Sequence, residues 1–244
     1  MKPFLLVSTR PEDEAIEAEY HSFLRASGLQ EDALEQVRLD MLGLPDIDVH
    51  SYTGIFVAGS PYGTTTPDDR KSPTQRRIEG ELAQLFADIT EAGTPCFATG
   101  YGMEVAAVLA GAPVTTTWAE GPSMADIMLT AEGVADPILV DFPRDFLTYV
   151  GHHEAVDAAP EGAVVLAKSL TCPIQMLRFS PTFYATQFNP EVDSDVISQR
   201  LSTYEDAGYG RPDDLGSLVL MGRNGPGKHQ AGHIIRNFVE MFSR

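Results

Sequence analysis

Residues Thr94–Val105 read TPCFATGYGMEV, the most informative stretch of this chain. The apolar run Cys96–Ala98 predicts a buried strand, and the Gly-Tyr-Gly that follows Thr99 predicts a sharp turn into a helix. An α/β enzyme uses this strand–turn–helix order to present a nucleophile above its sheet, with backbone N–H groups nearby that stabilise an oxyanion. Gly100 stands at the apex, so the turn offers no side chain for catalysis.

The segments around this turn alternate between strand-like and helix-like patterns. Phe4–Ser8 and Gly54–Ala58 are short apolar runs that predict strands. Pro11–Gly28, Pro73–Ala92 and Gly102–Ala110 carry apolar residues at helical spacing, and each is closed by a glycine. Strands separated by helices imply βαβ units, so we predict an α/β fold with a mostly parallel sheet.

From Val114 onward the pattern changes to short β-like segments, which predict a small antiparallel extension. These segments are Val114–Trp118, Ala125–Ala131, Phe146–His152, Ala163–Ser169, Ile174–Phe179 and Phe183–Phe188. Gly210–Gly227 is rich in Gly, Pro and Asp and predicts a mobile loop, and His233–Phe242 predicts a closing helix. With no repeats or low-complexity segments, residues 1–244 are expected to form one domain.

Three further segments occur in an informative order along the chain. They are GIFVAGSPYG at Gly54–Gly63, HHEAVDAAP at His152–Pro160 and YATQFNPEV at Tyr184–Val192. With the turn at Gly100, they resemble the class I glutamine amidotransferases, whose glutaminase domain has a glycine-rich oxyanion loop, a P-x-x-G-x-C-x-G-x-Q elbow and a late Q-F-H-P-E segment. The resemblance runs from Phe4 to Val192 and is nearest to the GMP-synthase-like members. It implies a three-layer, flavodoxin-like fold.

The resemblance also implies roles that this chain fulfils only in part. In the family a Cys attacks the glutamine carboxamide, a His takes its proton and a Glu orients the His. Here Gly100 stands at the Cys position and Asn189 at the His position, and an amide cannot accept a proton at neutral pH. Glu191 matches the family, whereas Glu104 stands where the family has Gln. Both members of the catalytic dyad are therefore replaced.

Other side chains are poor substitutes for the missing nucleophile. Cys96 lies inside an apolar strand and Cys172 lies in the turn-like segment SLTCPIQ, so both are expected to be inert. Thr99 would need a base beside it, and Asn189 cannot serve as one. We therefore predict that ordinary glutaminase chemistry is lost and that no cofactor is used.

Three functions stay open for such a site. The first is a pseudo-enzyme whose pocket binds a small amide, an amino acid or a zwitterion, or which regulates a partner. Its predicted ligand-binding residues are Gly59, Ser60, Pro61, Tyr101, Glu104 and His153. The second is a hydrolase or amidotransferase of altered chemistry, in which Glu104, Glu191 and Asn189 hold a water. The third is a structural component of a synthetase, and a homodimer is open as well.

Composition excludes several classes of partner. The 35 acidic and 17 basic side chains give a net charge of −18, which repels nucleic acid and anionic lipid. The basic group of Arg70, Lys71, Arg76 and Arg77 is interpreted as a solvated helix start balanced by nearby acids. The opening residues turn acidic too soon for a secretory signal, and no apolar run could span a membrane, so we expect a cytoplasmic protein.

The histidines do not predict a metal site. His152 and His153 are adjacent on a predicted strand, so their side chains should point to opposite faces. The resemblance implies that a His near this point borders the glutamine pocket without binding metal. No third ligand is evident, and His21, His50, His229 and His233 have still less support.

Overall fold

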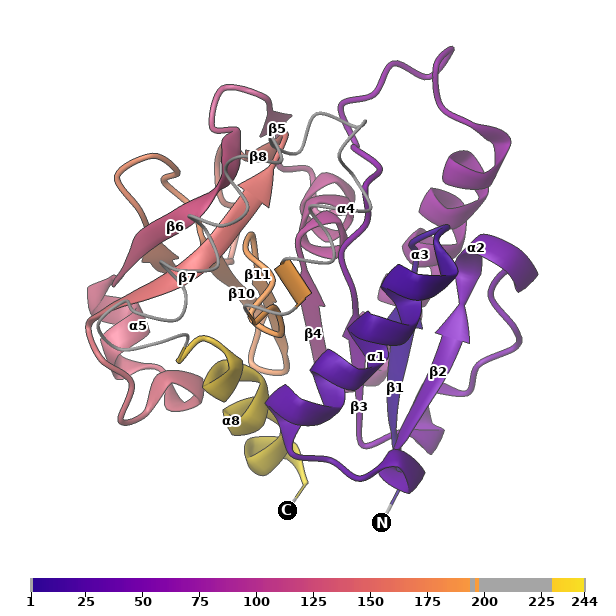
Figure 1. The fold of residues 1–244 in the computed structure, drawn as a ribbon, viewed down its shortest axis with the longest axis horizontal. Coiled ribbons are helices and arrows are strands. Elements are labelled where there is room, and N and C mark those ends of the chain that lie inside the picture. The colour runs from indigo at the N-terminus through magenta and orange to yellow at the C-terminus, as the bar shows by residue number, and fades with distance from the viewer. Residues whose placement is uncertain (1, 194–195, 198–229, 244) are drawn as a thin grey trace.

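The computed structural model describes residues 2–193, 196–197 and 230–243. Its centre is a nine-stranded sheet in the order β2-β1-β3-β4-β11-β10-β9-β6-β7 (Figure 1). In that order the strands are Leu34–Arg38, Phe4–Ser8, Gly54–Val57, Cys96–Thr99, Phe183–Thr186, Met176–Ser180, Val164–Lys168, Glu120–Leu129 and Asp145–His152. The predicted loop at Gly210–Gly227 and His229 lie outside the described residues.

The sheet has a parallel and an antiparallel part. Strands β2, β1, β3, β4 and β11 pair in parallel, and β11, β10, β9, β6 and β7 pair antiparallel. A separate small antiparallel sheet pairs β5 (Val114–Thr115) with β8 (Ala155–Val156). The predicted α/β class is confirmed. The main sheet is mixed, because it has as many antiparallel strand pairs as parallel ones.

The described helices are α1 (Asp13–Ser27), α2 (Leu39–Leu42), α3 (Pro73–Ala92), α4 (Tyr101–Leu109), α5 (Ala131–Ala135) and α8 (Gly232–Phe242), with 3₁₀ turns η1 (Glu31–Ala33), η2 (Val49–Ser51) and η3 (Pro137–Leu139). Helices α1, α3, α4 and α8 match the four predicted helical segments, whereas the short helices α2 and α5 were not predicted. Helix α3 begins where the Ser72 hydroxyl accepts a hydrogen bond from the Gln75 N–H, and it ends at the left-handed Gly93. In the described part of the chain, each helix is too short or too polar to cross a bilayer.

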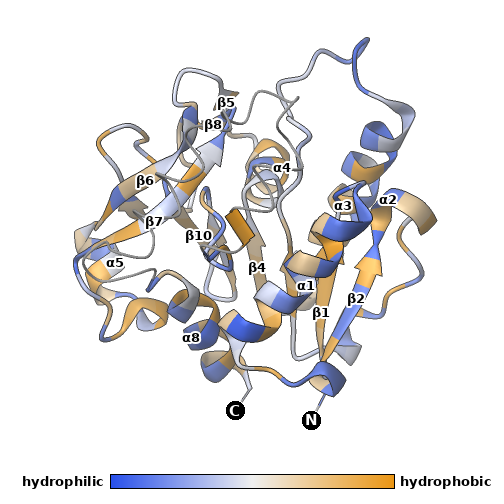
Figure 2. Cartoon of the chain, viewed as in Figure 1, coloured by the Kyte–Doolittle hydropathy of each residue, from blue (hydrophilic) through white to orange (hydrophobic). Residues whose placement is uncertain are grey.

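The sheet separates two hydrophobic clusters and so forms the middle of three layers. Leu5 and Val7 of β1 pack in the cluster that contains residues of α3 and α4, whereas Phe4 and Leu6 pack with residues of α1 and α8. This alternation arises because successive side chains of a strand point to opposite faces. In Figure 2 strand β1 is coloured as hydrophobic, whereas hydrophilic and hydrophobic residues alternate along helix α1.

Candidate functional site

The turn between β4 and α4 has the backbone of a sharp elbow. Gly100 has φ 51° and ψ −118°, in the region of positive φ that residues other than glycine rarely adopt. Its N–H donates to the carbonyl oxygen of Thr186 at 2.8 Å, which ties the elbow to the end of β11. A Cβ on Gly102 would lie 2.9 Å from the carbonyl oxygen of Val57, so this glycine allows α4 to pack closely on β3.

The side-chain amide of Asn189 lies beside the apex of this elbow. A Cβ on Gly100 would lie 3.2 Å from Asn189 Oδ1, and a Cβ on Gly59 would lie 2.9 Å from the same atom. Gly59 follows β3, Gly100 follows β4 and Asn189 follows β11. Because these strands are parallel, their carboxyl ends meet at one edge of the sheet, where open α/β sheets bind ligands.

A pocket of about 410 Å³ opens at this edge. All of the predicted ligand-binding residues line it: Gly59, Ser60, Pro61, Tyr101, Glu104 and His153, together with Gly100 and Asn189. Glu191 differs, because it is outside the lining of this pocket. Within the pocket, the water proposed between Glu104, Glu191 and Asn189 could therefore contact only Glu104 and Asn189.

Sequence reasoning missed several lining residues with polar side chains, among them Arg10, Arg70, Glu154 and Gln187. Arg10 lies just after β1, so the rule that parallel carboxyl ends converge could have identified it. Gln187 belongs to the QFNPEV segment, in which the family resemblance assigns roles only to the positions of Asn189 and Glu191. Arg70 was assigned to a solvated helix start. In that group Lys71 pairs with Glu79 as expected, but the exposed Arg70 borders the pocket.

Glu154 fixes the loop that follows β3. Its buried carboxylate accepts hydrogen bonds from the backbone N–H and the hydroxyl of both Thr64 and Thr65. A Cβ on Gly63 would lie 2.8 Å from Glu154 Oε2, so the loop approaches the carboxylate closely because this residue is glycine. Since Glu154 follows β7, one side chain links the loop of the parallel part to the antiparallel part.

Glu104 is a buried carboxyl group beside Glu154. Burial raises the pKa of Glu104 well above its usual range, and the charge of Glu154 raises it further, while a hydrogen bond from Gln187 lowers it. The Gln187 Nε2 donates to Glu104 Oε1 at 2.7 Å and to the carbonyl oxygen of Glu154 at 3.3 Å. The environment therefore favours the neutral, protonated form of Glu104.

We expect Glu104→Gln to stabilise the protein at neutral pH and to lose this advantage as the pH falls towards about 4.5. The folded state holds the Glu104 proton more tightly than the unfolded chain, so wild-type stability falls as the pH rises above the unfolded pKa. Glutamine does not titrate. Urea unfolding of both proteins between pH 4.5 and pH 8 measures the difference. Glu161→Gln, at an exposed site, is the control, and parallel curves for Glu104→Gln and wild type would contradict the prediction.

The remaining candidate nucleophiles and bases are held in unreactive settings. Burial raises the pKa of Cys96, and burial raises the pKa of Cys172 to about 12 although the hydrogen bond to Ile174 lowers it. Burial and the neighbouring Glu79 raise the pKa of Tyr101, whose hydroxyl donates to Glu79 Oε1 at 3.1 Å. Thr99 is completely buried at the end of β4.

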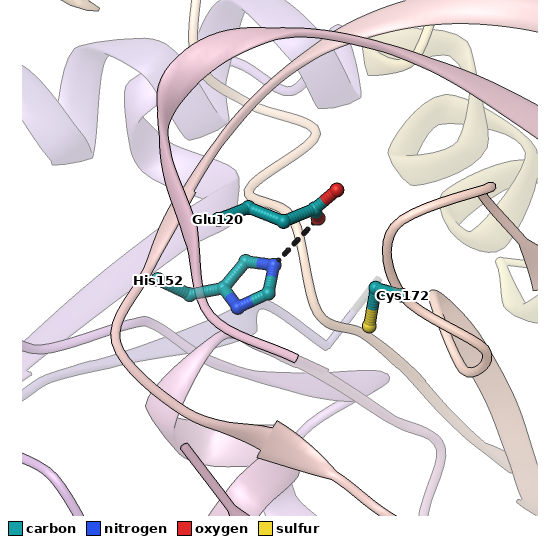
Figure 3. Close-up of side chains that lie close together, drawn as sticks. All are labelled: Glu120, His152 and Cys172. Carbon is teal, nitrogen blue, oxygen red and sulfur yellow. Dashed lines mark hydrogen bonds and ion pairs between the residues drawn. The ribbon is translucent and has the colours of Figure 1, made fainter. Parts of the chain in front are cut away.

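His152 and His153 both line the pocket, but they differ in burial. His153 is exposed, whereas His152 is buried beside Glu120 and Cys172 (Figure 3). The sequence showed no third ligand beside the two histidines, but the fold brings Glu120 and Cys172, which are distant in sequence, close to His152. Burial opposes the charge of Glu120, but hydrogen bonds from His152, Thr171 and Gln175 outweigh it and lower the Glu120 pKa.

Comparison with known proteins points to one family. The family model for glutamine amidotransferase class-I matches residues 27–203. A glutamine-hydrolyzing GMP synthase of Enterobacter sp. is 28% identical over 147 residues, which are 57% of this chain and 25% of that protein. A GMP synthase of Shewanella oneidensis is 29% identical over 146 residues, again 57% of this chain and 25% of that protein. The matched part thus spans about a quarter of these relatives.

Solved structures share the fold over nearly the whole chain. A glutamine amidotransferase from Thermotoga maritima superposes with a TM-score of 0.79 at 15% identity, covering 99% of this chain and 98% of that chain. A putative GMP synthase component from Thermoplasma acidophilum has a TM-score of 0.62 at 19% identity, covering 100% of this chain and 94% of that chain. At these identities the likeness establishes the fold and not the activity.

Proposed function

Because the chain belongs to the class I glutamine amidotransferase family, we propose that it is a member without glutaminase activity that binds a small molecule in the elbow pocket. The observation that carries this proposal is the apex itself. Gly100 has no side chain, and the group beside it is the amide of Asn189. Neither can act as a nucleophile or a general base, although the elbow backbone is retained.

The charges around the pocket support a ligand with both a positive and a negative end. Arg10 Nη2 lies 3.4 Å from the position of a Cβ on Gly59, and α4 begins at the elbow, where backbone N–H groups attract a carboxylate. The carboxylate of Glu154 and the neutral carboxyl group of Glu104 offer oxygen atoms to an ammonium or amide group farther along the lining. An amino acid, another zwitterion or a neutral amide therefore suits the pocket better than a polyanion.

The absence of glutaminase activity is tested directly by ammonia release. Without a nucleophile and a base, a triad enzyme retains only on the order of 10³ over the reaction in water. We expect purified protein to release no measurable ammonia from glutamine in a coupled assay. Turnover at ordinary enzyme rates that disappears in Cys96→Ala or Glu104→Gln would overturn the proposal.

Ligand binding is tested by thermal shift with glutamine, glutamate and a panel of amino acids and amides. Saturation at a hundred times Kd stabilises by about 2.7 kcal/mol and raises Tm by roughly 5 to 10 °C. Gly59→Ala should abolish the shift, because the added methyl group meets Asn189 Oδ1 at 2.9 Å. Gly80→Ala is the matched control, since its Cβ would meet no atom within 4 Å.

A structural role in a synthetase is the second candidate function. Its support is the similarity to GMP synthases, of which this chain matches about a quarter, and to a putative component of a GMP synthase. A panel without any thermal shift, together with a stable stoichiometric complex with a separately encoded synthetase, would favour this role. The altered-hydrolase alternative has less support, because Glu191 is outside the lining that contains Glu104.

A further inference from the structure

Three side chains from separate segments meet at the wall of the pocket, which His152 lines. Glu120 is the first residue of β6, His152 is the last residue of β7, and Cys172 lies in the turn between β9 and β10. One carboxylate oxygen, one ring nitrogen and the sulfur all lie within 4.8 Å of one another, and all three residues are buried (Figure 3). These are the three types of atom that bind zinc in proteins.

The hydrogen bonds of His152 leave one ring nitrogen directed at the cluster. Nδ1 lies 3.0 Å from the carbonyl oxygen of Glu154, which can only accept, so Nδ1 carries a proton. Nε2 then faces Glu120 Oε2 at 2.8 Å. A lone pair and a carboxylate oxygen at this distance require positive charge between them, either a second proton or a metal ion.

The surroundings of the cluster match the outer shell of a metal site. A histidine that binds a metal usually donates its other N–H to a carbonyl or carboxylate, as His152 does to Glu154. Glu120 in turn accepts hydrogen bonds from the hydroxyls of Ser169 and Thr171. These contacts fix the orientations of the imidazole and the carboxylate, while the Cys172 thiol donates to the carbonyl oxygen of Ile174 at 3.4 Å and would leave this bond on binding an ion.

Gln175 offers a fourth ligand. It is completely buried, its Nε2 donates to Glu120 Oε2 at 2.7 Å, and its Oε1 has no hydrogen-bond partner among the described residues. A half-turn of this amide would place the orphan oxygen beside the carboxylate. That position is unfavourable in the empty cluster and favourable when a cation lies between the two oxygens.

We propose that Glu120, His152 and Cys172 form a buried zinc site, with the side-chain oxygen of Gln175 as the fourth ligand. This inference is independent of the function proposed for the elbow pocket. Zinc bonds of about 2.0 to 2.3 Å place tetrahedral ligand atoms roughly 3.3 to 3.8 Å apart. Separations of up to 4.8 Å therefore need to shrink by about 1 to 1.5 Å, and the 2.8 Å contact between His152 and Glu120 needs to widen by about 0.5 Å. The thiol gives up its proton on binding, and the resulting thiolate and carboxylate balance the charge of the ion.

Such an ion would cross-link three segments of the antiparallel part of the sheet. Its ligands come from the start of β6, the end of β7 and the turn before β10, and a closed set of four protein ligands is typical of structural zinc. We therefore expect a site that stabilises the fold and takes no part in chemistry at the pocket.

The test uses the full chain, purified after expression with added zinc, and metal analysis by mass spectrometry. We expect about one zinc per chain, and chelation should lower Tm in a way that zinc reverses and magnesium does not. Replacement by cobalt should give the charge-transfer absorption of a thiolate–cobalt bond. A wild-type protein without bound zinc, or whose Tm is indifferent to zinc, would overturn the proposal.

Substitutions of the proposed ligands, compared with control substitutions nearby, test whether the zinc binds at this cluster. Cys172→Ser is nearly isosteric and should remove the cobalt–thiolate absorption and lower zinc affinity by at least tenfold; Glu120→Gln should lower the affinity similarly. His153→Ala and Cys96→Ala are the controls, because they replace a neighbouring histidine and the other free cysteine while leaving the cluster intact. Loss of the absorption in the Cys96→Ala control, or its retention in Cys172→Ser, would also contradict the site.

Discussion

Gly100→Cys combined with Asn189→His is expected to hydrolyse glutamine at least about 10²-fold faster than Gly100→Cys alone, because a general base contributes roughly 10²- to 10⁴-fold. A thiol without an imidazole partner stays largely protonated at neutral pH, since free cysteine titrates near about 8.5. The geometry permits the pairing, because the Cβ position of residue 100 lies 3.2 Å from the Asn189 side chain. The measurement is ammonia release from glutamine, with the wild-type protein as the background control.

The gain will be limited by strain and by Glu104. A non-glycine residue at φ 51° costs roughly 1 to 3 kcal/mol, so both cysteine variants should be less stable than wild type. Adding Glu104→Gln to the double variant restores the family's glutamine and should raise the activity further. If the single and double variants are equally active, Asn189 does not occupy the base position and the match to the family's Q-F-H-P-E segment is wrong.

Glu19→Gln is expected to lower the free energy of unfolding by about 3 to 5 kcal/mol, the usual cost of removing one partner from a buried ion pair. Glu19 Oε2 lies 2.8 Å from Arg10 Nε, and the Glu19 and Arg10 side chains are 0% and 5% exposed. The substitution leaves the Arg10 charge buried without this carboxylate, and Glu19 also accepts a hydrogen bond from Ser8. Urea or thermal unfolding measures the loss, equivalent to roughly 10 °C in Tm.

An exposed ion pair provides the control for this prediction. Arg25 and Asp193 lie 2.9 Å apart with side chains 53% and 41% exposed. Pairs of this kind contribute about 0 to 1 kcal/mol, so Arg25→Ala should change stability little. Similar losses for Arg25→Ala and Glu19→Gln would show that burial does not set the contribution of the Arg10–Glu19 pair.

The sequence predicted helices and strands best where the residues that start and end an element were all present. Helix α3 has an N-cap serine, a proline at its first position and a closing glycine, and its predicted and observed bounds agree. Strand β2 was missed because LEQVR lies at the edge of the sheet and buries only its first residue fully. A half-exposed edge strand lacks the apolar run that reveals a central one.

The backbone turns that form the site could be predicted from the sequence, but the hydrogen bonds between its polar side chains could not. Glycine turns after predicted strands indicated Gly59 and Gly100, because parallel strands bring such turns to one edge. The pairing of Glu154 with Thr64 and Thr65 joins residues about ninety positions apart, and no local pattern encodes it. The same holds for Glu120 and Cys172 around His152, which only the folding of β6, β7 and β9 brings together.

The carboxylate of Glu154 restrains one wall of the pocket. Its oxygens hold the loop after β3, while its own carbonyl oxygen accepts from His152, so the two walls are coupled through a single residue. The loop cannot swing outward like a lid without uncovering a buried negative charge, which is costly when its hydrogen bonds are lost. A ligand therefore meets a loop that is held in position on this side of the pocket, so the space between the loop and the end of β7 limits the dimensions of a molecule that contacts both.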